Sequence, residues 1–419
     1  MATSYSWKNT PVQTIHRNSL PDAKLNHEDA ATALNAVVDK SDTHADVTDH
    51  IHAPTNTERK LSWIERLIPG IERLAVEYHC GNFVVARGSE TPFFETMPLY
   101  ARLGMHLLFY GKEQVALLGN KRVYELLHEQ SVKQGAIYDD PKSVQSIPSF
   151  VETYSISLDE LEEPDIAKYK TFNEFFYRKI RADARPVENA DDELGICSAA
   201  DCRLTVFTSV DTAKAFWVKG ENFNIPNLLN LPADSPKVAP FQNASIAIFR
   251  LAPADYHRFH SPIDCEIGDI EHVPGHFYTV NPQAVNEPGF DVLTANVRDV
   301  LYLKHKPTGK EVAFVAIGAL LVGSIRWTGG GEKGKFLKRG DELGHFAYGG
   351  STIVAVFPKE IVEFDADLVS NSQKPIETLV KAGFSVGRAP RPGETKTLPE
   401  SAKLKKNWFE KAKDKLKKK

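Results

Sequence analysis

Two patterns of apolar and polar positions divide the chain. Apolar residues recur at helical spacing in "LSWIERLIPGIERLAVEYH" (61–79) and again over 98–135, which predicts amphipathic helices. From about Ile196 to Pro358, short alternating or β-branched runs are separated by Gly, Pro, Asn and Asp, which is typical of an antiparallel β-rich domain. The runs are CRLTVFTSV, AFWVKG, SIAIFRLAP, CEIGDIEHVPG, FYTVNP, DVLYLKH, EVAFVAIGALLVGSIRWTGG and STIVAVF. Together these elements predict an α+β fold.

Four segments follow from the same patterns. Residues 1–58 are polar and have almost no aromatic residues after Trp7, so we expect a mostly disordered leader that buries too little to offset its ordering entropy. A helical N-terminal region is expected over 59–187 and a β-rich catalytic domain over 188–389. The remainder, 390–419, is expected to be a basic, flexible tail.

The predicted N-terminal helices carry large apolar residues that suit either a protein core or a membrane surface. They are Trp63, Leu67, Leu99, Leu103, Leu107, Leu108 and Phe109. Core packing is the more common use of such a pattern, and a membrane-facing surface is the alternative.

Composition narrows the function classes. The chain has 419 residues, 42% of them hydrophobic, and a formal net charge of -4, which gives no general attraction to nucleic acid. No nucleic-acid partner is therefore expected. Neither a signal-peptide layout nor a run of about 18 apolar residues occurs, so we expect no signal peptide and no transmembrane helix. The cysteines form no CxxC pair, which indicates neither a disulfide framework nor a cysteine-rich zinc site.

The C-terminal tail has its own charge. Residues 401–419 contain nine lysines against Glu410 and Asp414. Such an end is either simply solvated or attracted to anionic lipid, which contributes about 1 kcal/mol per basic residue near a membrane surface. Trp408 and Phe409 would then be apolar contacts.

The densest polar cluster surrounds His257 and His260, which are separated by two residues and lie between apolar runs. The pair is compatible with a metal site, with structural histidines, or with general acid–base catalysis, because histidine changes charge near neutral pH. No zincin-type spacing accompanies it, so no metal is expected.

Two further residues are ambiguous by themselves. Asp201, among small residues before a β run, is ordinarily a turn former, unless a nearby histidine needs a carboxylate. Ser351, after Gly349 and Gly350, is ordinarily a turn residue, and neither a hydrolase elbow nor a phosphate loop surrounds it.

Taken together, seven segments resemble the phosphatidylserine decarboxylase family, over roughly Leu99 to Gly387. They are TFNEFFYRKIRADARP (171–186), SAADCRL (198–204), DYHRFHSPI (255–263), VPGHFYTVNPQAV (273–285), VAFVAIGALLVGSI (312–325), KRGDELGHFAYGGST (338–352) and ETLVKAGFSVG (377–387). The DCRL and GGST forms are similar to the eukaryotic type II branch. Many members of that branch have large N-terminal lipid-targeting domains; the first 60 residues are too short and too polar for these, so we expect the chain to depart from those members by lacking them.

The resemblance implies a fold and a maturation. The β-rich domain is expected to be an antiparallel barrel or sandwich related to the barrel-sandwich hybrids. The proenzyme would cleave itself between Gly350 and Ser351, by attack of the serine hydroxyl on the glycine carbonyl and β-elimination, leaving a pyruvoyl group on Ser351. The pyruvoyl group would serve in place of pyridoxal phosphate, forming a Schiff base with phosphatidylserine and releasing CO2 and phosphatidylethanolamine.

The resemblance also implies residue roles. Asp201 would orient His260, His260 would activate Ser351, and His257 would serve decarboxylation and protonation. His276, Phe277, Tyr278 and Asn281 would help to hold the substrate headgroup.

Partners and alternatives follow from the same resemblance. We expect phosphatidylserine in anionic membranes as the substrate, and we expect the two cleaved chains to stay associated. The protein is expected to be cytoplasmic or peripheral on endomembranes (Golgi, endosome or ER). The resemblance is also compatible with a homodimer. A pyruvoyl-dependent decarboxylase of a free aromatic amino acid such as tryptophan is the enzymatic alternative, and a non-catalytic lipid-binding protein the other.

Overall fold

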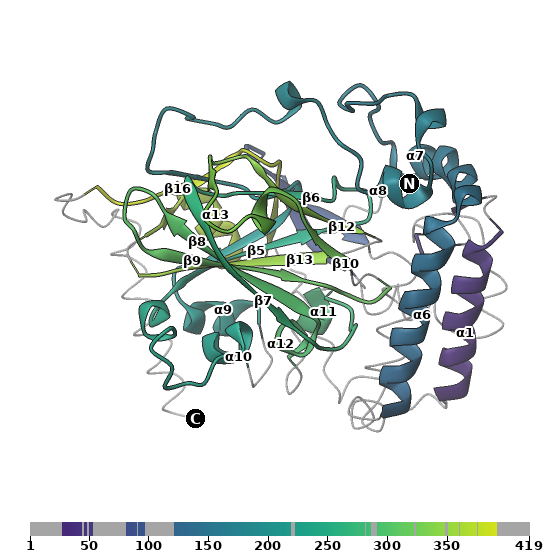
Figure 1. Cartoon of the computed structure of the whole chain (residues 1–419), viewed down its shortest axis with the longest axis horizontal. Coiled ribbons are helices and arrows are strands. Elements are labelled where there is room, and N and C mark those ends of the chain that lie inside the picture. The colour runs from purple at the N-terminus through teal and green to yellow at the C-terminus, as the bar shows by residue number, and fades with distance from the viewer. Residues whose placement is uncertain are drawn as a thin grey trace. The chain divides into compact units, whose positions relative to one another are not determined.

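The described part of the chain combines a helical layer with three β-sheets (Figure 1). This computed structural model describes residues 27–43, 46–47, 50–52, 81–89, 91–96, 121–218, 223–280, 282–285, 291–321, 324–347, 351–359, 361–374 and 376–391.

The largest sheet has ten strands in the order β11-β7-β8-β9-β13-β5-β4-β15-β1-β2. In chain order these strands are β1 (Gly81–Ala86), β2 (Phe93–Thr96), β4 (Cys202–Phe207), β5 (Ser245–Leu251), β7 (Cys265–Val273), β8 (Arg298–His305), β9 (Glu311–Ile317), β11 (Phe336–Leu337), β13 (Ser351–Phe357) and β15 (Glu377–Val380). All neighbours are antiparallel except β1 and β15.

Two three-stranded sheets complete the β structure, in the orders β10-β12-β6 and β14-β16-β3. Their strands are β3 (Gly195–Cys197), β6 (Arg258–His260), β10 (Ser324–Trp327), β12 (Glu342–Ala347), β14 (Glu363–Phe364) and β16 (Ser385–Arg388).

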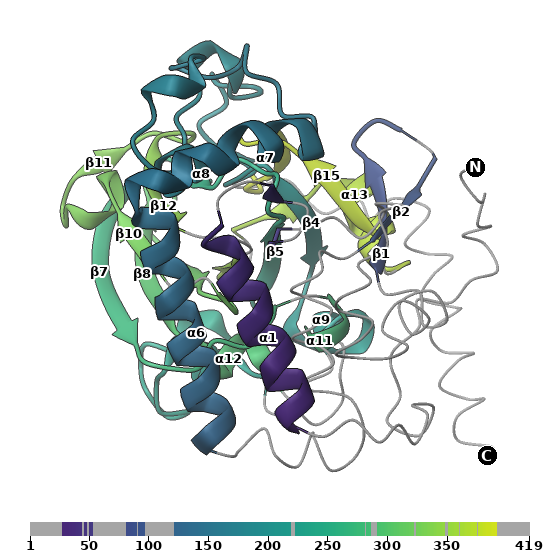
Figure 2. The same cartoon turned by 90° about the vertical axis from the view of Figure 1, so that its right-hand side faces the viewer.

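The described helices lie mostly before and between the strands. They are α1 (His27–Ser41), α6 (Lys121–Asp139), α7 (Ile147–Tyr154), α8 (Phe172–Phe176), α9 (Val210–Phe216), α10 (Ile225–Leu229), α11 (Pro282–Val285), α12 (Val292–Ala295) and α13 (Ala366–Ser372). Figures 1 and 2 show α1 and α6 side by side. Of the helices that the structure describes, none is long and apolar enough to cross a membrane.

The central strands are apolar on both sides because each face of the large sheet contacts a separate core. Along β13, Val354 and Val356 join the core shared with the helical layer, whereas Ile353 and Ala355 join the core on the side of the small sheets. The alternation is that of a strand buried on both faces. The α+β class is therefore confirmed, and the described strands form an open, sandwich-like arrangement rather than a closed barrel.

Four segments differ from the sequence-based expectations. The run FYTVNP (277–282), expected to be a strand, forms none in its described residues, and α11 begins at its last residue, Pro282. Residues 27–41, expected in a disordered leader, form α1, whose Leu34, Val37 and Val38 are buried in the core. The run AFWVKG (215–220) is expected to be a strand, but its first two residues are the end of α9. This helix begins after Ser209, whose hydroxyl accepts a hydrogen bond from the Thr212 N–H. The pair β1–β2 lies within the region expected to be helical.

Of the helices expected over 61–79 and 98–135, the first and most of the second lie outside the described residues, as do all seven large apolar residues named above. The described end of the second falls in α6.

Candidate active site

Four strand ends meet at one end of the large sheet. Ser351, the first residue of β13, pairs with Leu251 at the end of β5. Thr352 pairs with Ile317 at the end of β9. Because β4 starts directly after Asp201 and runs antiparallel to β5, Asp201 lies at this end too. The segment that leaves β5 from the same place carries His257 just before β6 (Arg258–His260) and His260 as the last residue of that strand, so the fold gathers segments far apart in the sequence.

Ser351 has the environment of a reactive group rather than of a turn residue. Its side chain is fully buried, and its hydroxyl has no hydrogen-bond partner among the described residues. A buried hydroxyl without a partner costs about 1–3 kcal/mol, so such groups are rare in native proteins. Gly349 and Gly350, and with them the predicted cleavage bond, lie outside the described residues.

His260 is held in one tautomer by the backbone. Its Nδ1 lies 2.9 Å from the Gly340 carbonyl oxygen, which can only accept, so Nδ1 carries the proton. Nε2 is then the basic nitrogen; it is buried and has no hydrogen-bond partner in the described part of the chain. Burial lowers the pKa of His260, and the Gly340 carbonyl and the charges of Glu342 and Asp201 partly offset the effect. The imidazole is thus a neutral base at neutral pH.

Asp201 is held by an arginine. Arg185 Nε lies 2.9 Å from Asp201 Oδ1 and Arg185 Nη2 2.6 Å from Oδ2, while the Ala382 N–H donates to Oδ1 at 2.9 Å. The structure records no hydrogen bond between Asp201 and His260; the carboxylate acts on the imidazole through its charge. The expected orienting contact is therefore made by Gly340, and the role of Asp201 stays a prediction.

His257 immediately precedes β6 and faces a different environment from His260. It is fully buried, and its Nδ1 lies 2.8 Å from the Asp255 carbonyl oxygen. Its ring centroid lies 4.0 Å from that of Phe176, in the helical layer. The two histidines thus differ in their backbone partners and in their ring neighbours.

A buried network of charges, which sequence reasoning missed, fixes the turn that carries His257. Arg203 binds both Glu95, at 2.5 Å, and Asp255, while Arg250 binds Glu377 at 2.5 Å and Glu95 at 3.3 Å. Burial raises the pKa of Asp255, and Arg203 opposes this rise. The only sequence signal was the presence of two arginines in otherwise apolar strands, which predicts buried partners.

The predicted substrate-binding loop lies at the same end of the sheet. Asn296 fixes it: its Oδ1 accepts from the Tyr278 N–H at 3.0 Å, and its Nδ2 donates to the carbonyls of Tyr278 at 2.8 Å and Gly318 at 2.9 Å. Gly318 directly follows β9. The ring centroids of His276 and Tyr278 lie 5.0 Å apart, so these two predicted residues lie together.

The other two residues of that prediction differ in status. The Phe277 ring lies 5.3 Å from His128 of α6, which connects the loop to the helical layer. Asn281 lies outside the described residues. Substrate binding by this loop stays a prediction.

Residues 172–388, just over half of the chain, match the model of the phosphatidylserine decarboxylase family. The chain belongs to the phosphatidylserine decarboxylase family. Asp201, His257, His260 and Ser351 all lie within the matched segment, whereas α1 and α6 precede it. The predicted family is confirmed.

Several relatives in the family show the extent of the similarity. The phosphatidylserine decarboxylase proenzyme 2 of Komagataella phaffii is 41% identical over 297 residues, which are 71% of this chain and 28% of that protein. Proenzyme 2 of Oryza sativa is 43% identical over 291 residues, 69% of this chain and 45% of that protein. The proenzyme of Fusobacterium nucleatum is 36% identical over 247 residues, 59% of this chain and 79% of that protein. The chain spans only 26% to 45% of the length of four fungal and plant relatives.

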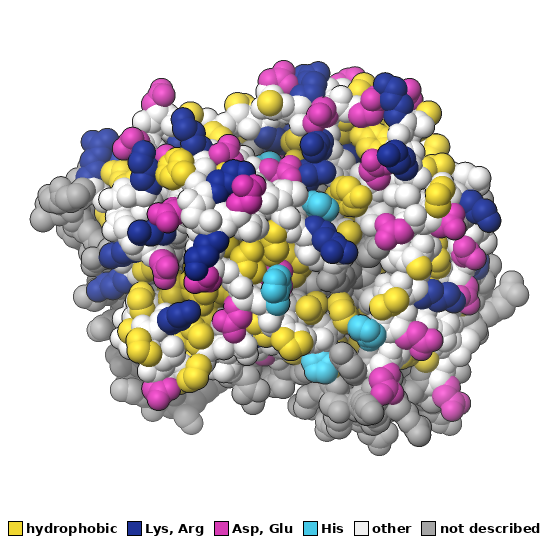
Figure 3. Space-filling view, viewed as in Figure 1, with side chains coloured by type: hydrophobic (Ala, Val, Ile, Leu, Met, Phe, Trp, Pro, Cys, Tyr) yellow, Lys and Arg dark blue, Asp and Glu magenta, His cyan; other side chains and the backbone are white. Residues whose placement is uncertain are grey.

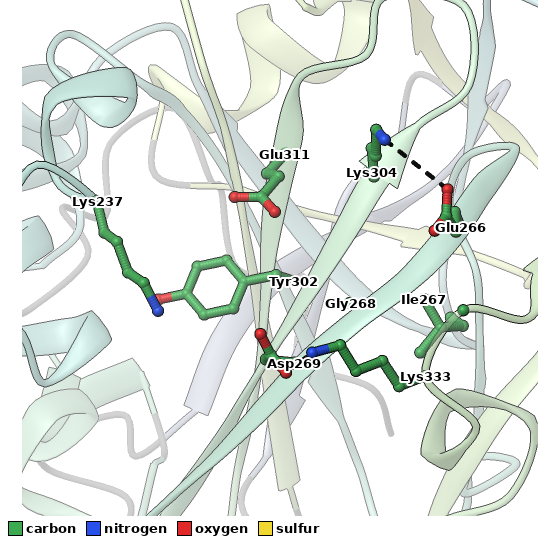
Figure 4. A pocket seen from close by; sticks show the side chains of 10 residues that line it. Lys237, Glu266, Ile267, Gly268, Asp269, Tyr302, Lys304, Glu311 and Lys333 are labelled. Carbon is green, nitrogen blue, oxygen red and sulfur yellow. Dashed lines mark hydrogen bonds and ion pairs between the residues drawn. The ribbon is translucent and has the colours of Figure 1, made fainter.

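A charged surface pocket lies away from the four predicted catalytic residues. Figure 4 shows it from close by. It has a volume of about 270 Å³ and is lined mainly by β7, β8 and β9. The two ends of β9 separate the pocket from the candidate site. Glu311, at the start of β9, lines the pocket, whereas Ile317, at the end of β9, pairs with Thr352 next to Ser351. None of the predicted site residues lines this pocket.

The surface around the described sheets is mixed. Figure 3 shows hydrophobic side chains gathered near the middle of one face, with charged side chains over most of the rest. Within the described residues, no group of three or more His, Cys, Asp and Glu side chains is placed to hold a metal ion.

Proposed function

We propose that the chain is a self-cleaving proenzyme that forms a pyruvoyl group from Ser351 and decarboxylates phosphatidylserine to phosphatidylethanolamine. The observation that carries the proposal is a buried serine hydroxyl that has no hydrogen-bond partner among the described residues, at the sheet end where the family segments converge. Family membership and the names of the relatives, which are proenzymes of phosphatidylserine decarboxylase, support it.

Cleavage uses residues of the chain alone. The Ser351 hydroxyl attacks the carbonyl carbon of Gly350 and gives its proton to Nε2 of His260. The peptide C–N bond breaks as the ester forms, and the proton passes to the departing amine. Loss of the serine α-proton and of the Gly350 carboxylate then leaves dehydroalanine, and water replaces its nitrogen, which leaves as ammonia.

Three features of the chain suit this step. The Gly340 carbonyl keeps the proton on Nδ1 of His260, so that Nε2 is free to accept one. Burial keeps the imidazole neutral, because its pKa is lowered. A glycine at position 350 has no Cβ to obstruct attack on its carbonyl.

The residue at position 351 would then carry the reactive group. A pyruvoyl group supplies an electrophilic carbonyl for the substrate amine and accepts the electron pair released with CO2. The fully buried position of Ser351 fits this chemistry, because it excludes water from the reacting centre. His257, held through Nδ1 by the Asp255 carbonyl, offers Nε2 for proton transfer to the product.

The two cleaved chains are expected to stay together. β13, which begins at Ser351, pairs with β5 on one side and with β9 on the other, and both precede the cleavage bond. β15 likewise pairs with β4. Separation would require breaking the centre of the large sheet.

Membrane access is part of the same proposal. The basic tail, whose residues 392–419 lie outside the described part, would be attracted to anionic lipid on endomembranes, where the substrate is located.

The test is an activity assay with two substrates. Purified protein is incubated with phosphatidylcholine vesicles that contain phosphatidylserine, and separately with free tryptophan, and released CO2 is measured. We expect CO2 and phosphatidylethanolamine from the vesicles only, and neither from the Ser351→Ala variant. Release of CO2 from tryptophan alone would instead establish the amino-acid decarboxylase, and binding to vesicles without any release would establish the lipid-binding alternative.

A further inference from the structure

His52 lies inside an aromatic cluster in the helical layer. It is fully buried, and four aromatic rings surround its imidazole at centroid distances of 5.3 to 5.6 Å. The four rings belong to Tyr138 of α6, Phe150 of α7, and Phe172 and Phe176 of α8. A histidine from a segment that precedes the family match thus lies at the centre of the layer.

Phe176 connects this cluster to the candidate active site. Its ring centroid lies 5.6 Å from that of His52, with the planes at 25°, and 4.0 Å from that of His257, with the planes at 38°. Phe176 itself is fully buried. Because protein interiors are close-packed, a buried ring in contact with both imidazoles has little freedom to tilt.

The segment that carries His52 is fixed to the helices that follow it. The Tyr154 hydroxyl donates a hydrogen bond to the His52 carbonyl, and the Val47 N–H donates to the Ser149 hydroxyl at 3.1 Å. Val47 and Ile51 are buried in the same core as α1. The position of His52 is therefore set by the contact of its own carbonyl and by the contacts of the residues just before it.

His52 presents a neutral ring to Phe176. Burial lowers the pKa of His52 well below its ordinary value, and the neighbouring His50 and His257 lower it further. When His257 takes up a proton, His52 therefore adds no second positive charge on the other side of Phe176, and the Phe176 ring remains available to the imidazolium.

We propose that His52 is a positioning residue for decarboxylation: it packs against Phe176, and Phe176 fixes the orientation of the His257 ring. This inference rests on the proposed role of His257, and it assigns a part in that reaction to a residue outside the segment matched by the family model.

The experiment replaces the ring and then restores it. His52→Leu keeps most of the buried apolar volume but removes the flat ring, whereas His52→Phe restores a ring that cannot titrate. His305→Leu is the matched control, because His305 is also fully buried but lies at the other end of β8, with Nδ1 2.9 Å from the Thr308 hydroxyl.

Two readouts are measured on the full chain. The first is CO2 release from phosphatidylserine per cleaved chain, alongside the extent of self-cleavage. The second is the NMR signal of the His257 ring protons in histidine-labelled protein, assigned by its loss in His257→Ala and sensitive to the ring current of Phe176.

We expect His52→Leu to cleave like the wild type, to lose about 10- to 100-fold in turnover per cleaved chain, as misplacement of a reacting group does, and to shift the His257 signal. His52→Phe should restore both, and His305→Leu should change neither. An unchanged His257 signal in His52→Leu, or an equal shift in the control, would overturn the inference. If the wild type cleaves but releases no CO2, the proposed function fails while the NMR comparison still decides the positioning.

Discussion

Arg203 gives the most quantitative prediction, because it is a buried cation between two carboxylates. Its side chain is 9% exposed and binds Glu95 and Asp255. Replacement by methionine keeps the aliphatic volume but leaves Asp255 with the Ala252 N–H, at 2.7 Å, as its remaining recorded partner. Glu95 keeps Arg250 at 3.3 Å. The main cost of Arg203→Met should therefore come from Asp255.

The size of this cost follows from burial. Removing one partner of a buried ion pair destabilises a protein by about 3–5 kcal/mol, because the other charge stays buried. Burial already raises the pKa of Asp255 against the opposing effect of Arg203, so the variant should raise this pKa further. When the pKa of a carboxyl group is higher in the folded than in the unfolded state, the protein loses stability as the pH rises from the unfolded-state pKa to the folded-state pKa. The penalty should therefore be larger at pH 8 than at pH 5.

The assay is urea unfolding followed by tryptophan fluorescence at both pH values. Arg203→Met/Asp255→Asn should recover part of the lost stability, because it removes the buried charge. Lys333→Met, which breaks an exposed pair with Asp269, should leave the unfolding midpoint near that of the wild type, because solvent screens exposed ion pairs. The reasoning is refuted if Arg203→Met has the wild-type midpoint at both pH values, or if the double variant is no more stable than the single one.

Three further predictions concern the site. Gly340→Ala should slow self-cleavage at least about tenfold, about 1.4 kcal/mol, because Gly340 has φ +92° and its carbonyl holds His260; a wild-type time course on denaturing gels would contradict this. The proposed self-cleavage needs neutral His260, whose pKa is lowered by burial, so the rate should fall with decreasing pH with a midpoint below about 6.5, the ordinary histidine value; a midpoint above that value in a pH series would count against His260 as the base. Asn296→Ala removes three hydrogen bonds, each worth about 1 kcal/mol, and should lower the thermal midpoint and raise the Michaelis constant for phosphatidylserine; unchanged values for both would show that the loop at Tyr278 does not depend on them.

The strands around the site were predictable because their local pattern and their final environment agree. SIAIFRL and STIVAVF are β-branched or apolar nearly throughout, and in β5 and β13 both faces are buried. AFWVKG has the same apolar character, but Ser209 caps a helix just before it, and this capping signal overrides the propensity of the run.

The missed residues depend on contacts between distant segments. Arg203 and Glu95 are 108 positions apart, and their pairing requires that β2 join the sheet edge near β4. Similarly, the polar composition of residues 1–58 led to the expectation of a disordered leader. The apolar residues of α1 are small and separated by polar ones, so its buried face was not recognised. Local periodicity carries no information on such pairings.

The candidate catalytic residues could be proposed only as a set. Asp201, His260 and Ser351 are each ambiguous alone, and the family resemblance, not their spacing, suggested a common role. The structure brings their segments to one end of the sheet, but it places the Gly340 carbonyl, rather than Asp201, on Nδ1 of His260. A backbone contact of this kind leaves no mark in the sequence.

Intact-mass spectrometry of the purified chain tests self-cleavage most directly. We expect two polypeptides, 1–350 and 351–419, the second with a pyruvoyl group in place of its N-terminal serine, and a single uncleaved chain for Ser351→Ala and for His260→Ala. A wild-type chain that remains intact after prolonged incubation at neutral pH, or a second polypeptide that begins with an unmodified serine, would contradict the account.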